Sequence, residues 1–282
     1  MFGDEFDITV RSHRLHAQRF GSRSAPLVIG VHGLTLNMKA FDYLGERLGD
    51  VLQLVAIDLR GRGLSPPTSP GTYGWDNHAR DVFAVADALG FERFSVVGQS
   101  MGGAVAMTAA EIDAGRLDAV VLVDIAGRVD PGAGAFIASS LAGISDEHDT
   151  IEAYLAAVRS HGLVDEWDGY WDRCHRYGAE IRDGVVRARI DPGALAEDRA
   201  YGSAHAGLYV YERWQHLTMP ALLLRATREL RPGTGHVVPA DDRDAFLRDV
   251  PTGTLVEVDA NHLTINTHPR TVEALRHFLP TP

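Results

Sequence analysis

A serine set between glycines is the residue pattern in this sequence that most directly suggests a reaction. The stretch Gly98–Gly103 contains the spacing G-x-S-x-G, after an apolar run at Phe94–Val97 and before an alanine-rich run at Met101–Ile112. This order predicts a strand, a sharp turn and a helix. A serine on such a turn stands above the sheet edge at a helix N-terminus, whose dipole favours developing negative charge. We therefore predict that Ser100 is a nucleophile.

A nucleophilic serine needs a base, and His262 is the histidine whose place in the chain fits that role. It follows the last apolar run, Leu255–Val258, and precedes a final helical pattern at Arg270–Phe278. Such a loop returns to the carboxyl edge of a parallel sheet, where ligands of open α/β sheets bind. His236 is the nearest alternative. The 13 histidines show no H-E-x-x-H or similar spacing, so we expect no metal.

The elements that must hold these residues follow an alternating pattern. Short apolar runs alternate with helical periodicity up to residue 126 and again from residue 218, which predicts βαβ units and a mainly parallel sheet. Residues 127–217 break the rhythm with helical patterns and many aromatic residues. We predict a core domain of residues 1–126 and 218–282 and a helical cap of residues 127–217. Most cap aromatics are expected to form the core of the cap, and four are chosen as pocket-lining candidates: Trp167, Trp171, Tyr209 and Trp214.

Four stretches in order resemble the α/β-hydrolase fold superfamily over nearly the whole chain: Val31–Leu34, Asp58–Ser65, Gly98–Gly103 and Asp259–His262. The resemblance implies a mostly parallel eight-stranded sheet flanked by helices, with a cap inserted after the sixth strand. It also implies an esterase- or lactonase-like serine hydrolase. The backbone N–H groups of Met101 and Leu34 would then form the oxyanion hole, with Leu34 also lining the substrate pocket. His32 would support that loop.

The carboxylate behind His262 has two candidates. The common family position follows the seventh strand, where Ala226 and Glu229 stand in place of the usual glycine and aspartate. Some lipases and haloalkane dehalogenases use a position after the sixth strand, which is Asp124 here. We prefer Glu229 and keep Asp124 as the alternative, because either side chain can hold the imidazole tautomer.

Composition limits the remaining classes. The formal net charge of -11 opposes binding to nucleic acid or anionic membranes, and no apolar stretch is long enough for a transmembrane helix. The acidic N-terminus lacks the features of a secretory signal, so a cytoplasmic location is expected. A single cysteine, Cys174, excludes an internal disulfide. We expect a small-molecule substrate and no cofactor, and leave a homo-oligomer open.

The sequence thus predicts hydrolysis of a carboxylic ester or lactone of a medium-sized apolar or aromatic substrate through an acyl-enzyme. A serine nucleophile argues against haloalkane dehalogenase or epoxide hydrolase chemistry, which uses a carboxylate. Cleavage of an amide, thioester or carbon–carbon bond remains open, as does cofactor-free perhydrolysis. An alternative from another class is a ligand-binding, weakly hydrolytic receptor-like protein.

Overall fold

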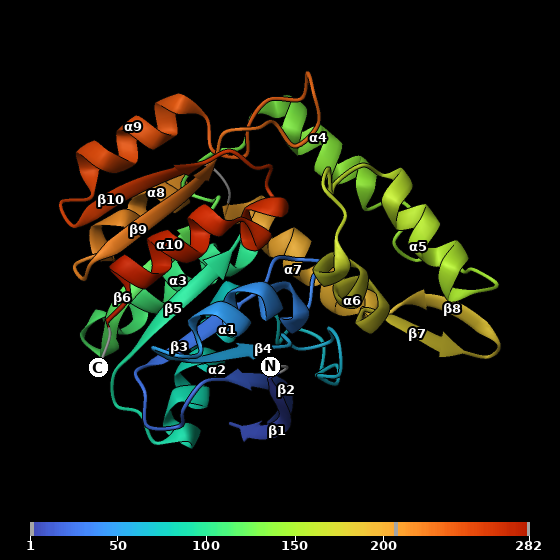
Figure 1. The fold of residues 1–282 in the computed structure, drawn as a ribbon, viewed down its shortest axis with the longest axis horizontal. Helices are drawn as coiled ribbons and strands as arrows, with labels where there is room; N and C mark the ends of the chain where they lie inside the picture. Colours follow the sequence, from blue (N-terminus) through green and yellow to red (C-terminus); the bar gives the residue numbers. More distant parts are fainter. Residues whose placement is uncertain (1–2, 206–207, 281–282) are drawn as a thin grey trace.

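A mixed eight-stranded sheet forms the centre of the molecule (Figure 1). The computed structural model describes residues 3–205 and 208–280. The strand order is β1-β2-β4-β3-β5-β6-β9-β10; β2 runs antiparallel to both of its neighbours, and the pairs from β4 to β10 are parallel. The expected eight-stranded, mostly parallel sheet is therefore confirmed.

The strands of the sheet are short, and most of them are buried. Their bounds are β1 Asp4–Val10, β2 His13–Phe20, β3 Leu27–Val31, β4 Gln53–Ile57, β5 Phe94–Gln99, β6 Leu117–Val123, β9 Ala221–Ala226 and β10 Gly253–Val258. A separate antiparallel hairpin consists of β7 Ala179–Arg182 and β8 Val185–Ala188. The helices are α1 Asp42–Leu48, α2 Trp75–Leu89, α3 Met101–Asp113, α4 Pro131–Ser140, α5 Ile151–Ser160, α6 Gly169–Tyr177, α7 Pro192–His205, α8 Leu208–Arg213, α9 Ala240–Asp249 and α10 Pro269–Phe278.

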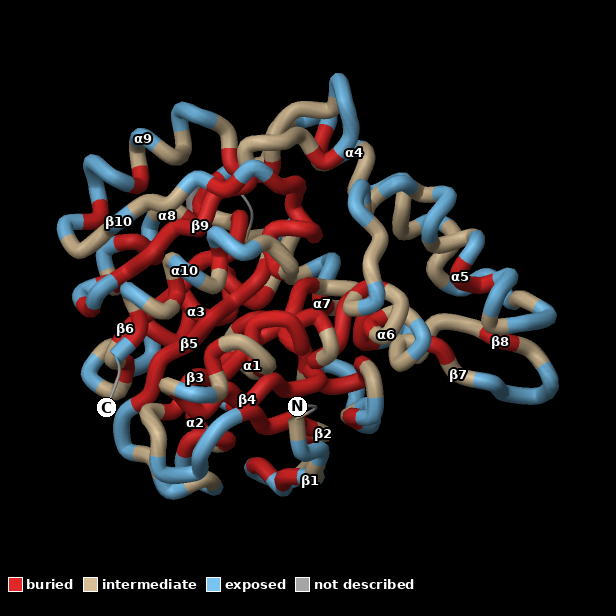
Figure 2. The backbone as a smooth tube through the Cα atoms, in the orientation of Figure 1, coloured by how far each residue is buried: buried red, intermediate tan, exposed pale blue. Residues whose placement is uncertain are grey.

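Helices cover both faces of the sheet and enclose two apolar clusters. One cluster joins the sheet to α2, α3, α8 and α9, and the other joins it to α1, α6 and α10. Figure 2 shows the central strands buried along most of their length, whereas most of α9 and the tip of the β7–β8 hairpin are exposed. Strands buried on both faces read as continuous apolar runs, which explains why the runs in the sequence located them.

The residues between β6 and β9 form α4 to α8 and the β7–β8 hairpin. Figure 1 shows α4, α5 and the hairpin projecting beside the sheet. By contrast, α7 contacts α2 and α8 contacts α3, and Trp214 belongs to the larger core cluster. The segment is thus mostly helical with one hairpin, and its last part packs directly on core helices. Division of the chain into core and cap at residues 126 and 218 remains a prediction.

Among the described residues, no helix combines the length and apolar character needed to cross a membrane.

Candidate active site

Ser100 occupies a strained turn between β5 and α3. Its backbone has φ 54° and ψ -121°, a region that residues other than glycine rarely adopt. A Cβ on Gly98 would overlap the backbone of Gly102, and a Cβ on Gly102 would overlap the carbonyl of Val31. The two glycines are therefore required by the close approach of β3, β5 and α3 around the serine.

His262 lies in the loop after β10 and is paired with Asp124. Its Nδ1–H donates to Asp124 Oδ2 at 2.8 Å, and both side chains are almost completely buried. The second carboxylate oxygen, Oδ1, accepts the backbone N–H of Ala226 at 2.9 Å. Asp124, the residue after β6, also has a positive φ of 49°. With Nδ1 as the donor, Nε2 of His262 is left as the acceptor that a general base requires.

The structure does not place the Glu229 carboxylate, the preferred candidate, beside His262. The Glu229 carboxylate accepts the backbone N–H groups of Gly233 at 2.6 Å and Gly235 at 3.1 Å, and so closes the loop that follows β9. Asp124 holds the position beside His262 because it extends β6 by one residue, with its N–H bonded to Leu224 O at 2.7 Å. The alternative location, after the sixth strand of the expected fold, is the one in contact with the imidazole.

The loop of His262 is fixed from both sides. Asn261 Oδ1 accepts the N–H groups of Leu263 and Thr264, and its Nδ2 donates to Leu163 O at 2.9 Å. Asn261 thus forms a side-chain turn and links the loop to residue 163. On the other side, Gln99 Nε2 donates to the carbonyl of His262 at 3.3 Å.

Leu34 and Met101 present backbone N–H groups near Ser100. Neither N–H has a protein acceptor among the described residues, and Gly33 lies close enough that an added Cβ would be 3.2 Å from Ser100 Cβ. His32 fixes the Gly33–Leu34 peptide: its Nε2 accepts Leu59 N–H at 3.0 Å, so Nδ1–H donates to Gly33 O at 2.7 Å. Because the N–H of a trans peptide points opposite to its carbonyl, the bond to Gly33 O also sets the direction of the Leu34 N–H. Burial lowers the pKa of His32 to about 3, so the ring stays neutral.

A buried ion pair supports the same loop from the other side, and no motif in the sequence marks it. Arg62 Nε donates to Leu34 O at 3.3 Å, and its Nη2 lies 2.7 Å from Asp198 Oδ2 on α7. His78 Nε2 is 3.0 Å from Asp198 Oδ1. Burial alone would raise the pKa of Asp198, but the His78 and Arg62 charges outweigh it and lower that pKa to about 2.

Ser100 and His262 line the same cavity, which has a volume of about 100 Å³. Leu34 of the predicted oxyanion loop lines it as well. The other lining residues are mostly aliphatic, and none of the lining residues is Asp, Glu, Lys or Arg: Gly33, Thr35, Leu36, Gln99, Ile137, Ser140, Leu141, Val158, Leu163, Val164, His175, Leu230 and Leu263. Such a lining favours an uncharged, largely apolar ligand.

The three tryptophan candidates for the pocket do not line this cavity. Trp171 is buried, with its Nε1–H donating to Thr267 Oγ1 at 3.2 Å, and Trp214 donates to Ala126 O at 3.0 Å within the core. Trp167 stacks on His175 with ring centroids 5.1 Å apart. The side chain of Tyr209 lies outside the described residues. The aromatic ring of this segment that lines the cavity is His175, which no sequence motif marks.

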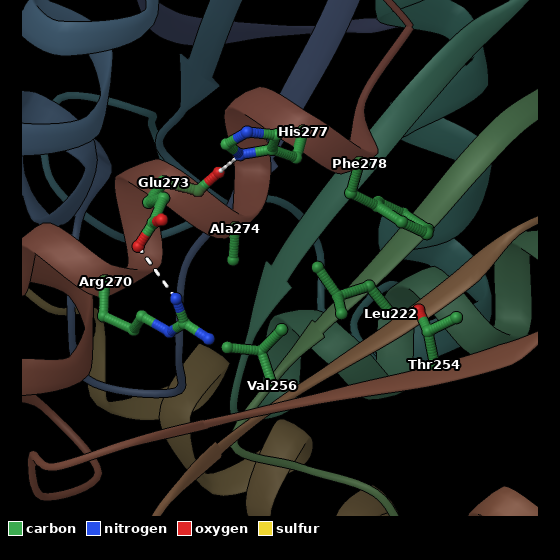
Figure 3. A pocket seen from close by; sticks show the side chains of 8 residues that line it. All are labelled: Leu222, Thr254, Val256, Arg270, Glu273, Ala274, His277 and Phe278. Carbon is green, nitrogen blue, oxygen red and sulfur yellow. Dashed lines mark hydrogen bonds and ion pairs between the residues drawn. The ribbon is translucent and has the colours of Figure 1, made fainter.

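Another hollow lies between α10 and the beginnings of β9 and β10 (Figure 3). Its charged groups satisfy one another: Arg270 Nη1 donates to Glu273 Oε2 at 2.9 Å, and His277 Nδ1–H donates to Glu273 O at 2.7 Å. It adjoins Leu222 and Thr254 near the amino ends of their strands, whereas Ser100 and Asp124 follow carboxyl ends. We assign it no part in the reaction.

Within residues 3–205 and 208–280, no three His, Cys, Asp or Glu side chains cluster closely enough to hold a metal ion.

Comparison with known proteins agrees with this fold. The family described as alpha/beta hydrolase fold matches residues 26–193, more than half of the chain. N-formylmaleamate deformylase of Pseudomonas putida is 27% identical over 266 residues, covering 85% of this chain and 92% of that protein. 2-(Acetamidomethylene)succinate hydrolase of Mesorhizobium japonicum is 32% identical over 136 residues, 47% of this chain and 49% of its own. The crystal structure of E-2-(acetamidomethylene)succinate hydrolase superposes with a TM-score of 0.84 at 23% identity over 98% of both chains.

Proposed function

Because this chain belongs to the α/β-hydrolase fold family, we propose that it is a serine hydrolase that acts through an acyl-enzyme on Ser100. The observation that carries the proposal is the His262–Asp124 pair, whose imidazole lines the same cavity as the strained Ser100. This combination supplies a nucleophile, a base in the required tautomer and a carboxylate that orients the base.

The proposed reaction has two steps. Ser100 Oγ attacks the acyl carbon while its proton passes to His262 Nε2, and the oxygen of the tetrahedral intermediate is bound by the N–H groups of Leu34 and Met101. His262 then gives the proton to the leaving group as the bond from the acyl carbon to that group breaks. Water, deprotonated by His262, attacks the acyl-enzyme, and the proton returns to Ser100 as the acid leaves.

The bond we propose is a carboxylic ester or lactone with an apolar acyl group. The uncharged cavity supports an apolar group, and its volume of about 100 Å³ favours a small one, below the roughly 300 Å³ of larger ligand sites. The medium-sized aromatic substrate expected from the cap tryptophans has less support, because those rings do not line the cavity.

An amide substrate is the second candidate, and the relatives favour it. The names N-formylmaleamate and 2-(acetamidomethylene)succinate both denote compounds with an acylated nitrogen. The same proposed residues would cleave an amide, with the proton from His262 delivered to nitrogen. A matched ester and amide of the same butanoyl group, assayed side by side, separates the two: turnover of the amide that Ser100→Ala abolishes assigns the amide class, and turnover of the ester alone assigns the ester class.

The test of the serine mechanism is covalent labelling combined with turnover of 4-nitrophenyl butanoate. We expect a fluorophosphonate to add to Ser100, located by peptide mass spectrometry, and Ser100→Ala to abolish both labelling and turnover. Labelling at another residue, or turnover that survives Ser100→Ala, would contradict the proposal. A receptor-like protein would bind ligand with no turnover in either form.

A further inference from the structure

Two polar atoms in the wall of the cavity have no hydrogen-bond partner among the described residues. They are Oε1 of Gln99 and Nε2 of His175, and both are shielded from solvent. Gln99 Oε1 lies against Gly33, beneath the loop that carries the predicted oxyanion donor. His175 comes from α6 instead, and it is not part of the proposed proton transfer. A buried polar atom without a partner costs free energy, so its persistence at a cavity wall points to a ligand that satisfies it.

Packing holds the His175 ring in a fixed position. The Trp167 ring stacks on it at 5.1 Å with an angle of 18° between the planes, and Trp171 lies at 6.1 Å. The helix itself is anchored beside the Leu34 loop, since Asn37 Nδ2 donates to the carbonyl of Cys174 at 2.9 Å. A ring held in this way is preorganised and loses little conformational entropy when a ligand binds.

The ring lines the cavity and carries a buried, neutral nitrogen. Burial lowers the pKa of His175 to about 4, against a smaller opposing effect of Asp172. No carboxylate, ammonium or guanidinium group is among the residues that line the cavity. The hydrogen-bonding group that pairs with Nε2 must therefore be uncharged, because an ionised group would be desolvated there without a counter-ion.

We propose that His175 is a substrate-binding residue whose Nε2 hydrogen-bonds an uncharged polar group on the substrate, such as a carboxamide, ketone or hydroxyl. The neutral imidazole can donate or accept at Nε2 according to its tautomer. The site therefore selects a substrate with an apolar body and one neutral polar end, and it rejects an ionised carboxylate of the same shape. This inference rests on the proposed hydrolysis at Ser100 for its kinetic readout only.

The test uses 4-nitrophenyl esters in matched sets of three. For acyl chains of four to six carbons, the chain ends in a carboxamide, in an isosteric isopropyl group or in a carboxylate. A second series consists of butanoate esters of alcohols whose chains carry the same three end groups. It is included because the polar group can lie on either side of the scissile bond. In at least one series we expect kcat/KM for the carboxamide to exceed that for the isopropyl and carboxylate esters by at least about tenfold.

Variants at position 175 assign that preference. We expect His175→Phe to reduce the ratio of carboxamide to isopropyl turnover about tenfold, and His175→Gln, which keeps a hydrogen-bonding end, to restore part of it. His161→Phe, a histidine of the same segment that does not line the cavity, is the matched control and should leave the ratio unchanged. A preference that survives His175→Phe, or a wild-type protein that prefers isopropyl ends in both series, would overturn the inference.

Calorimetry on Ser100→Ala separates this inference from the proposed function. The probes are the carboxamide and isopropyl esters themselves. Ser100→Ala should bind the carboxamide ester about tenfold more tightly than the isopropyl ester. The double variant Ser100→Ala, His175→Phe should bind the two esters equally. If the wild type turns over no ester while this binding difference remains, the hydrolase proposal fails and the His175 site stands. If turnover occurs without the difference, the reverse holds.

Discussion

Replacement of Asp124 by asparagine tests the arrangement around His262 most sharply. Asp124 Oδ1 accepts the N–H of Ala226 at 2.9 Å, while Oδ2 accepts His262 Nδ1–H at 2.8 Å. In Asp124→Asn the amide oxygen keeps the bond to Ala226, because that backbone group can only donate. The new NH₂ group must then face His262 Nδ1, which becomes an acceptor. The proton moves to Nε2, and the imidazole can no longer take the proton of Ser100.

The expected loss follows from that tautomer change. A buried carboxylate behind a catalytic histidine is worth about 10⁴ in kcat in serine hydrolases, or about 5 kcal/mol of transition-state stabilisation. The assay is hydrolysis of 4-nitrophenyl butanoate under saturating conditions, with circular dichroism to show that the variant is folded. KM should change little, because Asp124 does not line the cavity.

Glu229→Gln is the matched control, since it makes the same chemical change at the carboxylate first preferred from the sequence. Its amide oxygen can still accept one of the two N–H bonds from Gly233 and Gly235, so we expect kcat to stay within about threefold of the wild type. The reasoning is refuted if Glu229→Gln loses as much activity as Asp124→Asn, or if Asp124→Asn retains more than about a tenth of the wild-type rate.

The other predictions concern stability. His32 is protonated near pH 6.5 in the unfolded chain but only near pH 3 in the folded protein, so the stability that this ring contributes is full above pH 6.5 and falls with decreasing pH. Urea unfolding should show a loss of roughly 2 kcal/mol in the free energy of unfolding by about pH 5, and a flat profile would contradict this. Gly102→Ala places a Cβ against the backbone of Val31 and should lower the free energy of unfolding by about 3 kcal/mol or more. In Gly33→Ala the new Cβ meets the movable end of the Gln99 side chain, so this variant should fold but lose about tenfold or more in kcat. Equal unfolding midpoints for the two variants would count against the packing described. Amide hydrogen exchange should be faster in α4, with one buried residue, than in α7, with three, and the opposite order would refute it.

The sequence located Ser100 because the information is local. Strand, turn and helix follow one another within Phe94–Asp113, and the glycine spacing reports contacts made by that turn itself. His262 was found for a similar reason, since it stands in a short loop between the last strand and the last helix. Buried parallel strands leave continuous apolar runs, which made the sheet predictable as well.

The acid and the cavity wall depend on long-range packing that no local pattern records. Asp124 and Glu229 follow neighbouring strands, and the choice between them is decided by the path of the chain after β9, which turns Glu229 toward Gly233 and Gly235. His175 has no motif around it. Its place at the cavity follows from how α6 packs on the Leu34 loop. Aromatic content alone pointed to Trp167 and Trp171, which pack against the His175 ring and do not line the cavity.

The ion pair between Arg62 and Asp198 has a consequence for how ligands gain access to Ser100. Separating a buried charge pair costs about 3–5 kcal/mol, so any opening motion that lifts α7 away from Arg62 must overcome that penalty. Helix α4 carries the cavity residue Ile137 but buries only Ala133. We therefore expect α4 to move on microsecond to millisecond timescales when a ligand enters, while α7 stays in place and keeps the proposed oxyanion donors, the N–H groups of Leu34 and Met101, aligned.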